Sequence, residues 1–327
     1  MSAAASSPPT LQASAPLLVV ITGPTGSGKS DLALALCEQL QAELPVEIVS
    51  VDSVLVYRGM DIGSAKPASA ARLRVPHHLI DIRDPAQSYS AGEFVRDARA
   101  VITAIQQRGR LPLLVGGTML YLRALRDGIA ALPPASAELR RELDAQAASE
   151  GWPALHAELA RVDAAAAARI ARGDAQRIQR ALEVHRLTGV PISQWQSATR
   201  HARREFRWLR FALLPAARED WRRHLAVRFD AMLHAGLLEE VRALYARGDL
   251  TERHASMRAV GYRQLWHYCA GDCTLEQAVQ QAVVATGQLA KRQLTWLRRE
   301  QDLIPLAAHA VGLAAIVARS IHTAACA

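Results

Sequence analysis

A glycine-rich segment near the N-terminus constrains the fold of this chain more than any other feature. It follows directly on an apolar run at residues 17–21 and has the spacing G-x-x-x-x-G-K-S. This spacing is typical of a loop between a buried strand and a helix, where backbone N–H groups surround phosphate oxygens. Lys29 would add positive charge, and Ser30 would offer its hydroxyl to a magnesium ion. We therefore expect the loop to bind at least two linked phosphates through Gly23, Pro24, Thr25, Gly26, Ser27, Gly28, Lys29 and Ser30.

The loop alone leaves open whether these phosphates belong to a nucleotide. The chain has 327 residues, half of them hydrophobic, which is enough for a large core and more than one folding unit. Its net charge of +8 and pI near 9.8 suit a polyanionic partner.

The strands and helices expected after the loop indicate an α/β core. Residues 31–41 have the composition of a helix, and residues 46–51 form a second strand-like run that ends at Asp52. Residues 111–115 and 206–214 are further strand-like runs, the first followed by two glycines and Thr118. Strands separated by helices predict a P-loop core with a parallel sheet flanked by helices and ligands at the carboxyl ends of the strands. Asp52 and Thr118 are both expected at that edge.

Residues 133–201 lack strand signals and predict an all-helical insertion. Helical runs are expected at 135–148, 152–160 and 163–171. A further helix has Asp174 as its N-cap and ends at Gly189, with one apolar stripe facing a core. On composition alone, its other face is a solvated surface that carries an ion pair between Arg180 and Glu183.

The remaining segments complete the expected division of the chain. Long helical segments are predicted at 221–245 and 275–299, and basic residues precede them at Arg200, Arg203, Arg204, Arg207 and Arg210. We expect a disordered tail at 1–16, the first part of the core at 17–132, its second part at 202–305 and a C-terminal tail at 306–327.

Cysteine spacing and hydropathy exclude several classes of protein. The four cysteines lack paired C-x-x-C spacing, so neither a zinc site nor a disulfide framework is expected. Residues 1–16 lack the pattern of a secretory signal, and the apolar stretch at 310–318 is too short to span a bilayer. We expect a cytoplasmic protein without membrane contact.

Several ordered motifs resemble the family of tRNA dimethylallyltransferases. The resemblance extends from about residue 18 to residue 299 and includes a conspicuous run directly after the second strand. The matching segments are DSVLVYRGMDIGSAKP at 52–67, PHHLID at 76–81, YSAGEF at 89–94, VGGTMLY at 115–121, QRIQRALE at 176–183, RAVGYRQ at 258–264 and AKRQLTWL at 290–297.

The resemblance implies a specific reaction at the glycine-rich loop. The loop would hold dimethylallyl diphosphate with Mg²⁺, and the prenyl group would pass to the exocyclic amine of the adenosine 3′ to the anticodon, releasing diphosphate. By resemblance, Asp52 takes the proton from that amine, Thr118 orients the reacting groups and Arg228 reaches the diphosphate. A magnesium-held cradle that stabilises a departing diphosphate is physically reasonable for this chemistry.

The same resemblance assigns the second substrate, the anticodon stem-loop of tRNA. The adenine must leave its stack to enter a narrow site. The expected contacts surround the two catalytic residues, the insertion and a late segment of the core. They are Asp52, Ser53, Val54, Leu55, Thr118, Arg140, Gln176, Arg177, Ile178, Gln179, Arg180, Arg258, Ala259, Val260, Gly261, Tyr262 and Arg263.

Two positions depart from the family pattern. Gly26 stands where alanine is usual, and Gly287 stands where arginine is common, so any contact made by that arginine is absent here. The chain lacks the zinc-finger extension of some eukaryotic members, which is typical of the bacterial type, and a monomer is expected. The alternatives are a nucleotide or metabolite kinase, an enzyme that prenylates free adenine nucleotides, and a non-catalytic tRNA-binding protein.

Overall fold

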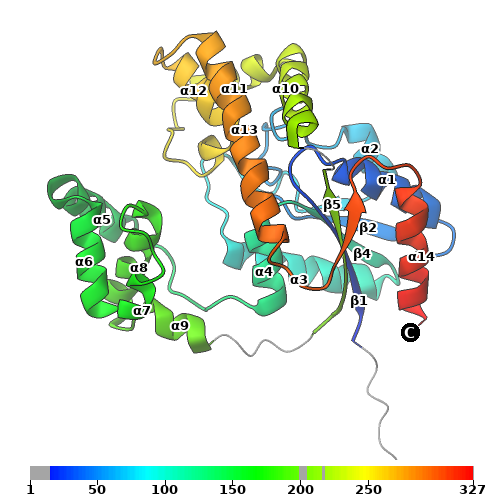
Figure 1. Ribbon diagram of the computed structural model, residues 1–327, viewed down its shortest axis with the longest axis horizontal. Coiled ribbons are helices and arrows are strands. Elements are labelled where there is room, and N and C mark those ends of the chain that lie inside the picture. Colours follow the sequence, from blue (N-terminus) through cyan, green and yellow to red (C-terminus); the bar gives the residue numbers. More distant parts are fainter. Residues whose placement is uncertain (1–14, 199–204, 216–217, 327) are drawn as a thin grey trace, which may run out of the picture. The chain divides into compact units, whose positions relative to one another are not determined.

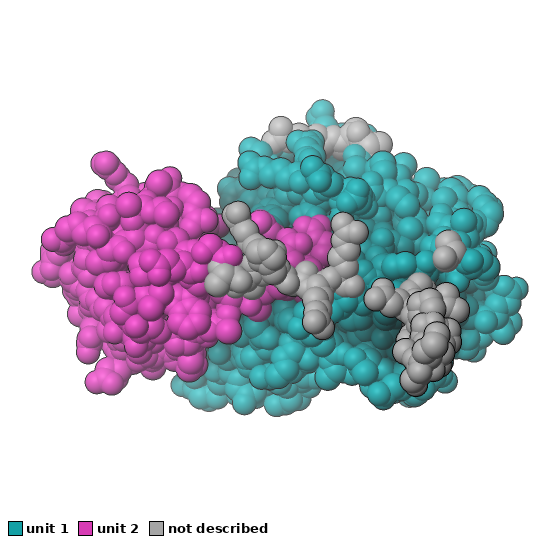
Figure 2. All heavy atoms as spheres, turned by 90° about the horizontal axis from the view of Figure 1, so that it is seen from below, with its two compact units in different colours: residues 1–122, 204–327 teal, residues 123–203 magenta. Residues whose placement is uncertain are grey.

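The computed structural model describes residues 15–198, 205–215 and 218–326. Most of the expected N-terminal tail lies outside these ranges, as do Arg200, Arg203, Arg204 and the expected boundary between residues 201 and 202. The described chain divides into two compact units, residues 1–122 with 204–327 and residues 123–203 (Figure 2).

The first unit is built on one sheet of six parallel strands (Figure 1). The central strands are continuous apolar runs because helices cover both faces of such a sheet. The expected strands at 46–51, 111–115 and 206–214 are confirmed within a residue at each end. In spatial order the strands are β3 (His77–His78), β2 (Val46–Ser50), β4 (Leu111–Gly116), β1 (Leu17–Thr22), β5 (Arg207–Leu214) and β6 (Leu303–Ala307).

The described part of this unit contains ten helices, counting one 3₁₀ turn. Several have clear start signals: Ser90 and Glu93 form a capping box at the start of α3, and Thr274 and Gln277 do so at α13. The helices are α1 (Lys29–Leu40), α2 (Ser69–Arg74), α3 (Ala91–Gln107), α4 (Met119–Asp127), α10 (Arg218–His234), α11 (Leu237–Ala246), η1 (Ser256–Arg258), α12 (Tyr262–Cys269), α13 (Leu275–Leu297) and α14 (Leu313–Ala325).

The helical segment expected at 221–245 is two helices rather than one. Helix α10 ends at His234 and α11 begins at Leu237. Gly236 has φ of 101°, a left-handed backbone that glycine adopts without steric cost and that a continuous helix cannot contain. The break lets α11 take a direction of its own.

The C-terminal segment expected as a tail is instead part of the core. Residues 303–307 form β6, and α14 packs against α1 (Figure 1). Val317, Ala318 and Ile321 of α14 are buried in the same apolar cluster as Leu36 of α1. The apolar stretch at 310–318 therefore runs into an amphipathic helix, whose buried face at Val317, Ala318 and Ile321 packs against α1 at the other end of the sequence.

The second unit contains only helices among its described residues. They are α5 (Ala137–Glu150), α6 (Trp152–Val162), α7 (Ala164–Ala167), α8 (Ala175–Thr188) and α9 (Ile192–Ala198), in addition to the end of α4. Its own core contains Leu143, Leu155, Leu159, Ile178 and Leu182. The helix predicted between Asp174 and Gly189 is confirmed as α8: the Asp174 side chain accepts a hydrogen bond from the Arg177 backbone N–H, and Gly189 has φ of 70°.

No helix in the described ranges combines the length and apolarity needed to cross a bilayer.

Candidate active site

The glycine-rich loop joins β1 to α1 at the carboxyl edge of the sheet. Gly26 and Gly28 have φ of 76° and 78°, a conformation that glycine adopts without strain. A Cβ at Gly23 would lie 2.7 Å from the carbonyl oxygen of Leu213 on β5, so the loop approaches the sheet too closely for a side chain there. The loop ends at the N-terminus of α1, where backbone N–H groups favour an anion.

Lys29 is the cation of this loop, and its charge is coupled to two neighbours. Its Nζ donates a hydrogen bond to the carbonyl oxygen of Pro24 at 2.7 Å. Burial lowers the pKa of Lys29 to about 8, the carboxylate of Asp52 opposes that shift, and the guanidinium of Arg228 adds to it. Asp52 and Arg228 therefore both lie within electrostatic range of Lys29.

Arg228 is a second cation at the loop. It comes from α10, and burial lowers its pKa, while the charge of Asp31 in the first turn of α1 opposes that shift. Among the described residues it has no hydrogen-bond partner. A half-buried guanidinium beside Lys29 is costly without an anion, so the pair favours a ligand with several negative charges.

Asp52 follows β2 at the same edge of the sheet. Its Oδ1 accepts hydrogen bonds from the backbone N–H groups of Val54 at 2.7 Å and Leu55 at 3.2 Å. These two bonds fix the carboxylate on a tight turn and leave Oδ2 without a hydrogen bond from the described residues. The second oxygen is therefore available to a substrate.

Thr118 follows β4 and holds the Asp52 turn in place. Its Oγ1 accepts a hydrogen bond from the Ser53 N–H at 3.2 Å, and its own backbone N–H donates to the Val51 carbonyl. A Cβ at Gly116 would lie 2.1 Å from the Val51 carbonyl oxygen, so glycine is required where the two loops meet. The predicted catalytic pair thus lies on adjacent, interlocked loops.

The loop after Asp52 is anchored by two residues that the sequence analysis did not single out. Glu240 of α11 accepts hydrogen bonds from the backbone N–H groups of Asp61, Ile62 and Gly63. Lys66, whose side chain is 2% exposed, donates to the carboxylates of Asp61 and Asp81, both at 2.5 Å. Lys66 lies within the matched motif at 52–67, but Glu240 had no local signal.

Gln293 of α13 is a third such residue, and it contacts the glycine-rich loop directly. Its Oε1 accepts a hydrogen bond from the Thr25 N–H at 2.8 Å, while its Nε2 donates to the Gly117 carbonyl at 3.0 Å. Gln293 lies within the matched segment at 290–297, but nothing in that segment indicated its role.

The predicted tRNA contacts in the second unit fall into two groups. Glu183 is completely buried and binds Arg140 and Arg180, with Nε to Oε1 at 2.9 Å and Nη1 to Oε2 at 2.6 Å. This face is therefore not simply solvated, because Glu183 pairs with both guanidinium groups inside the unit. Gln179 donates to Asp144, and the Ile178 side chain is buried. Gln176 and Arg177 are exposed.

The predicted contacts at 258–263 are also mixed. Arg258 and Arg263 are exposed, and Arg258 donates to the Arg253 carbonyl oxygen. Tyr262 is fully buried, and its hydroxyl donates to Glu240, so its side chain supports the Asp61–Gly63 anchor. Gly261 has φ of 91° and begins α12, while Ala259 and Val260 are half-buried.

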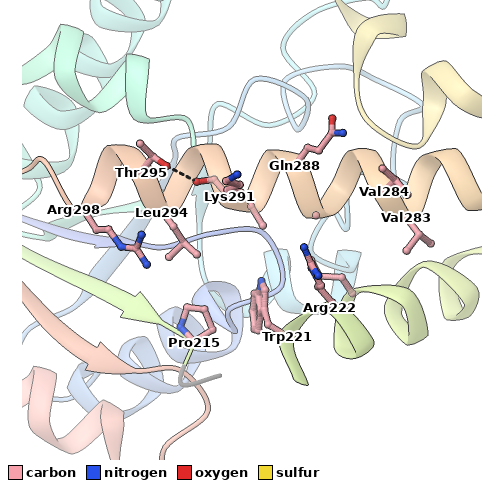
Figure 3. A pocket seen from close by; sticks show the side chains of 13 residues that line it. Pro215, Trp221, Arg222, Val283, Val284, Gln288, Lys291, Leu294, Thr295 and Arg298 are labelled. Atoms are coloured by element: carbon pink, nitrogen blue, oxygen red, sulfur yellow. Dashed lines mark hydrogen bonds between the residues drawn. The ribbon is translucent and has the colours of Figure 1, made fainter. Parts of the chain in front are cut away.

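A cavity of about 700 Å³ lies between α10 and α13 (Figure 3). Its wall is apolar at Trp221, Leu225 and Leu294, with Arg222 and Lys291 beside them. Gly287 also lines it, and a Cβ there would meet nothing within 4 Å. Gly287 therefore leaves open space where the resemblance led us to expect an arginine.

The metal ligands that Ser30 and Asp52 offer are oxygen atoms. The described ranges contain no group of three or more His, Cys, Asp and Glu side chains that could hold an ion. The exposed Ser30 hydroxyl at the start of α1 and the Asp52 carboxylate offer the hard oxygen ligands that Mg²⁺ prefers, and Mg²⁺ commonly completes its shell with substrate phosphates and water. The residues present therefore fit a metal carried with a diphosphate.

Comparisons with known proteins point to one family. Residues 55–300 match the family described as IPP transferase. A protein from Paracidovorax citrulli named tRNA dimethylallyltransferase is 56% identical over 293 residues, which cover 86% of this chain and 84% of that protein.

Solved structures agree as well. A full-length tRNA isopentenylpyrophosphate transferase from Bacillus halodurans is 35% identical with a TM-score of 0.68, over 94% of this chain and 96% of that one. A eukaryotic dimethylallyltransferase described as acting on tRNA is 25% identical with a TM-score of 0.78, over 94% of this chain and 79% of that one. The family match spans most of the chain and includes Thr118, Arg228 and Gln293. This chain therefore belongs to the IPP transferase family.

Proposed function

We propose that this chain transfers the dimethylallyl group from dimethylallyl diphosphate to the exocyclic amine of the adenosine 3′ to the anticodon in tRNA, releasing diphosphate. The observation that carries the proposal is that hydrogen bonds of Gln293 and Thr118 hold the glycine-rich loop and the Asp52 turn at the same edge of the sheet. A cradle for phosphates and a free carboxylate oxygen thus meet at one edge of the sheet. The names of the curated relatives support the same reaction.

The donor would bind with its diphosphate on the loop amides, Lys29 and Arg228. Mg²⁺, held by Ser30 and substrate oxygens, would neutralise the charge that develops on the diphosphate as it leaves. Lys29 is still mostly protonated at neutral pH, since its pKa is about 8. The two cations of the chain stabilise the departing anion where its charge appears, which is the largest contribution that a preorganised site makes.

The acceptor would meet Asp52. In the proposed step the adenine amine nitrogen forms a bond to the first carbon of the prenyl group, the bond between that carbon and the diphosphate oxygen breaks, and one amine proton passes to Asp52 Oδ2. The N–H groups of Val54 and Leu55 hold the carboxylate while this happens. Thr118 keeps the turn aligned through Ser53. Alignment matters more than basicity here, because a neutral exocyclic amine is a weak nucleophile.

We propose that the anticodon stem-loop contacts exposed polar side chains, chiefly Gln176, Arg177, Arg258 and Arg263. The net charge of +8 favours this polyanionic partner. Arg140 and Arg180 are both paired with Glu183, so any contact they make with RNA is made from within these ion pairs. Their pairs also hold α8, which carries Gln176, in position. We further propose that the enzyme acts as a monomer in the cytoplasm, where unmodified tRNA is available.

The test is transfer of labelled dimethylallyl from its diphosphate to unmodified bacterial tRNA with magnesium. Wild type is compared with Asp52→Ala and with Glu43→Ala, an exposed acid that pairs only weakly with His322 at 3.5 Å. We expect label in tRNA for wild type and Glu43→Ala and its loss in Asp52→Ala.

Parallel reactions separate the alternatives. ATP turnover without label in tRNA would identify a kinase, and label in AMP instead of tRNA would identify an enzyme of free nucleotides. Binding of tRNA with neither reaction would leave a tRNA-binding protein.

A further inference from the structure

We propose that Gln293 is a positioning residue that sets the distance between the diphosphate cradle and the acceptor groups. The inference rests on the proposed function, because it concerns how the two substrates are aligned. It begins from the position of Gln293 on α13, which is 268 residues from Thr25 in the sequence but within hydrogen-bond distance of it.

The chemistry of the two contacts requires a neutral carboxamide. Thr25 presents a backbone N–H, which needs an acceptor, and Gly117 presents a carbonyl, which needs a donor. A glutamine side chain supplies one of each on a single planar group. An ionised glutamate could accept from Thr25 but could not donate to Gly117, and a lysine or arginine could not accept.

The two hydrogen bonds of Gln293, to Thr25 and to Gly117, form a bridge between the loops after β1 and β4. This bridge needs a glycine at position 117. A Cβ at Gly117 would lie 2.6 Å from Gln293 Nε2 and 3.0 Å from the carbonyl oxygen of Gly23. Any side chain at this position would therefore push the glutamine away and separate the loops after β1 and β4. The glycine at 117 thus has a packing reason that its place beside Gly116 did not reveal.

The bridge continues through Thr118 to the proposed catalytic carboxylate. Thr118, the next residue after Gly117, accepts from the Ser53 N–H, and Ser53 follows Asp52. Strands β1, β4 and β2 are neighbours in the sheet, so Gln293 spans the first gap between their loops and Thr118 spans the second. Two hydrogen-bonded links, joined by the backbone of Gly117–Thr118 and Asp52–Ser53, therefore connect the proposed diphosphate loop to the proposed proton acceptor.

Displacement at carbon depends steeply on this spacing. The amine nitrogen, the carbon and the leaving oxygen must be in line, and a misplacement of about 1 Å can cost about 10²-fold in rate. Gln293 would act on the rate of the transfer step itself, with little effect on the affinity for either substrate, since it leaves Lys29, Arg228 and the exposed arginines in place.

The experiment measures single-turnover transfer with both substrates saturating. Gln293→Leu keeps a similar volume without either hydrogen bond, and Gln281→Leu is the matched control at an exposed position of the same helix. We expect Gln293→Leu to lower the rate by about 10²-fold. The affinity for inorganic diphosphate, the affinity for tRNA and the urea midpoint should stay close to those of wild type, as they should in Gln281→Leu.

A second variant tests the hydrogen bonds and keeps the inference testable if Gln293→Leu does not fold. Gln293→Glu restores both a donor and an acceptor when its carboxyl is protonated. The ratio of its transfer rate to that of wild type should therefore rise as pH falls, whereas the ratio for Gln293→Leu should not.

Two results would overturn the inference: a saturated rate within threefold of wild type for Gln293→Leu, or a flat pH ratio for Gln293→Glu. If wild type itself transfers no label, the proposed function fails instead, and the two failures are distinguishable in one assay.

Discussion

Strand β2 carries carboxylates at both ends, and their surroundings differ completely. Glu47 near its start has a side chain that is 3% exposed and binds Arg108, Arg110 and His78. Asp52, just beyond its end, accepts only from backbone N–H groups among the described residues and has Lys29 as its charged neighbour. One carboxylate is saturated by three side chains, and the other keeps an oxygen for a substrate.

The difference shows how one strand serves stability at one edge and chemistry at the other. Burial raises the pKa of Glu47, but hydrogen bonds from Arg108 and His78 outweigh it, so that pKa lies below its ordinary value. A buried carboxylate with all its partners inside the protein is a structural group. Glu183 repeats this arrangement in the second unit, with Arg140 and Arg180 as its partners.

The largest effect is expected from Asp52→Asn. The amide still accepts from Val54 and Leu55 but cannot take a proton, so the single-turnover rate should fall by about 10²- to 10⁴-fold. The free energy of unfolding should change by less than about 1 kcal/mol. Transfer assays and urea unfolding on the same preparation measure both. A large loss of unfolding free energy in Asp52→Asn would contradict this comparison, because Asp52 would then be a structural group like Glu47.

Glu47→Gln should give the opposite pattern. Removing the charge leaves the hydrogen bonds of Arg108 and His78 weakened, and the free energy of unfolding should fall by about 1–3 kcal/mol. The transfer rate of the folded protein should not change. Glu38→Gln is the control, because Glu38 and its partner Arg74 are both more than half exposed, and its effect should stay below about 1 kcal/mol.

The pH dependence of stability sharpens this second prediction. Because the folded-state pKa of Glu47 is lowered, its contribution is complete above the unfolded value of about 4.3 and is lost as pH falls through the folded-state pKa. The difference in unfolding free energy between wild type and Glu47→Gln should therefore shrink below that pH. A difference that stays constant down to the acid transition would contradict the assignment.

The smallest effect concerns Lys29, which links Asp52 to the diphosphate cradle. Its pKa of about 8 means that the free protein loses this charge as pH rises through that value, so affinity for inorganic diphosphate should fall over the same range. Calorimetry at pH 8 in buffers of different ionisation enthalpy should detect uptake of part of a proton on binding. Lys29→Arg, which stays charged, should take up less than wild type, because only the protonation change of diphosphate itself remains.

Asp52→Asn provides a cross-check on the coupling. The Asp52 carboxylate raises the pKa of Lys29, so its removal should move the decline in diphosphate affinity to lower pH. If the pH midpoint of this decline did not change, Lys29 and Asp52 would not interact. The two residues would then belong to separate sites.

Local sequence was enough to locate the loops of the site but not what joins them. Apolar runs followed by Gly23, Asp52 and Thr118 predicted one edge of a parallel sheet, because the carboxyl ends of parallel strands meet there. Glu240 and Gln293 reach that edge from helices far along the chain. Nothing in the periodicity of α11 or α13 distinguishes these side chains from ordinary polar residues of an exposed face.

The same limit explains the other differences from expectation. The sequence predicted the ion pair between Arg180 and Glu183 but placed it on a solvated face. Glu183 is instead buried and also pairs with Arg140, because α5 and α8 pack together. Residues 306–327 were expected as a tail, yet α14 covers α1. In each case the partner is remote in sequence, and burial depends on a surface that only the folded chain provides.

By itself, then, the sequence determined the α/β core, the glycine-rich loop, the helical insertion and the family, since these depend on spacing and hydrophobic periodicity within short segments. The tertiary structure decided which polar side chains have all their hydrogen-bond partners inside the protein and which remain available to substrates. The reason is physical: a hydrogen bond needs two partners within about 3 Å. Whether Asp52 keeps a free oxygen while Glu47 does not depends on how the whole chain packs around the two ends of β2.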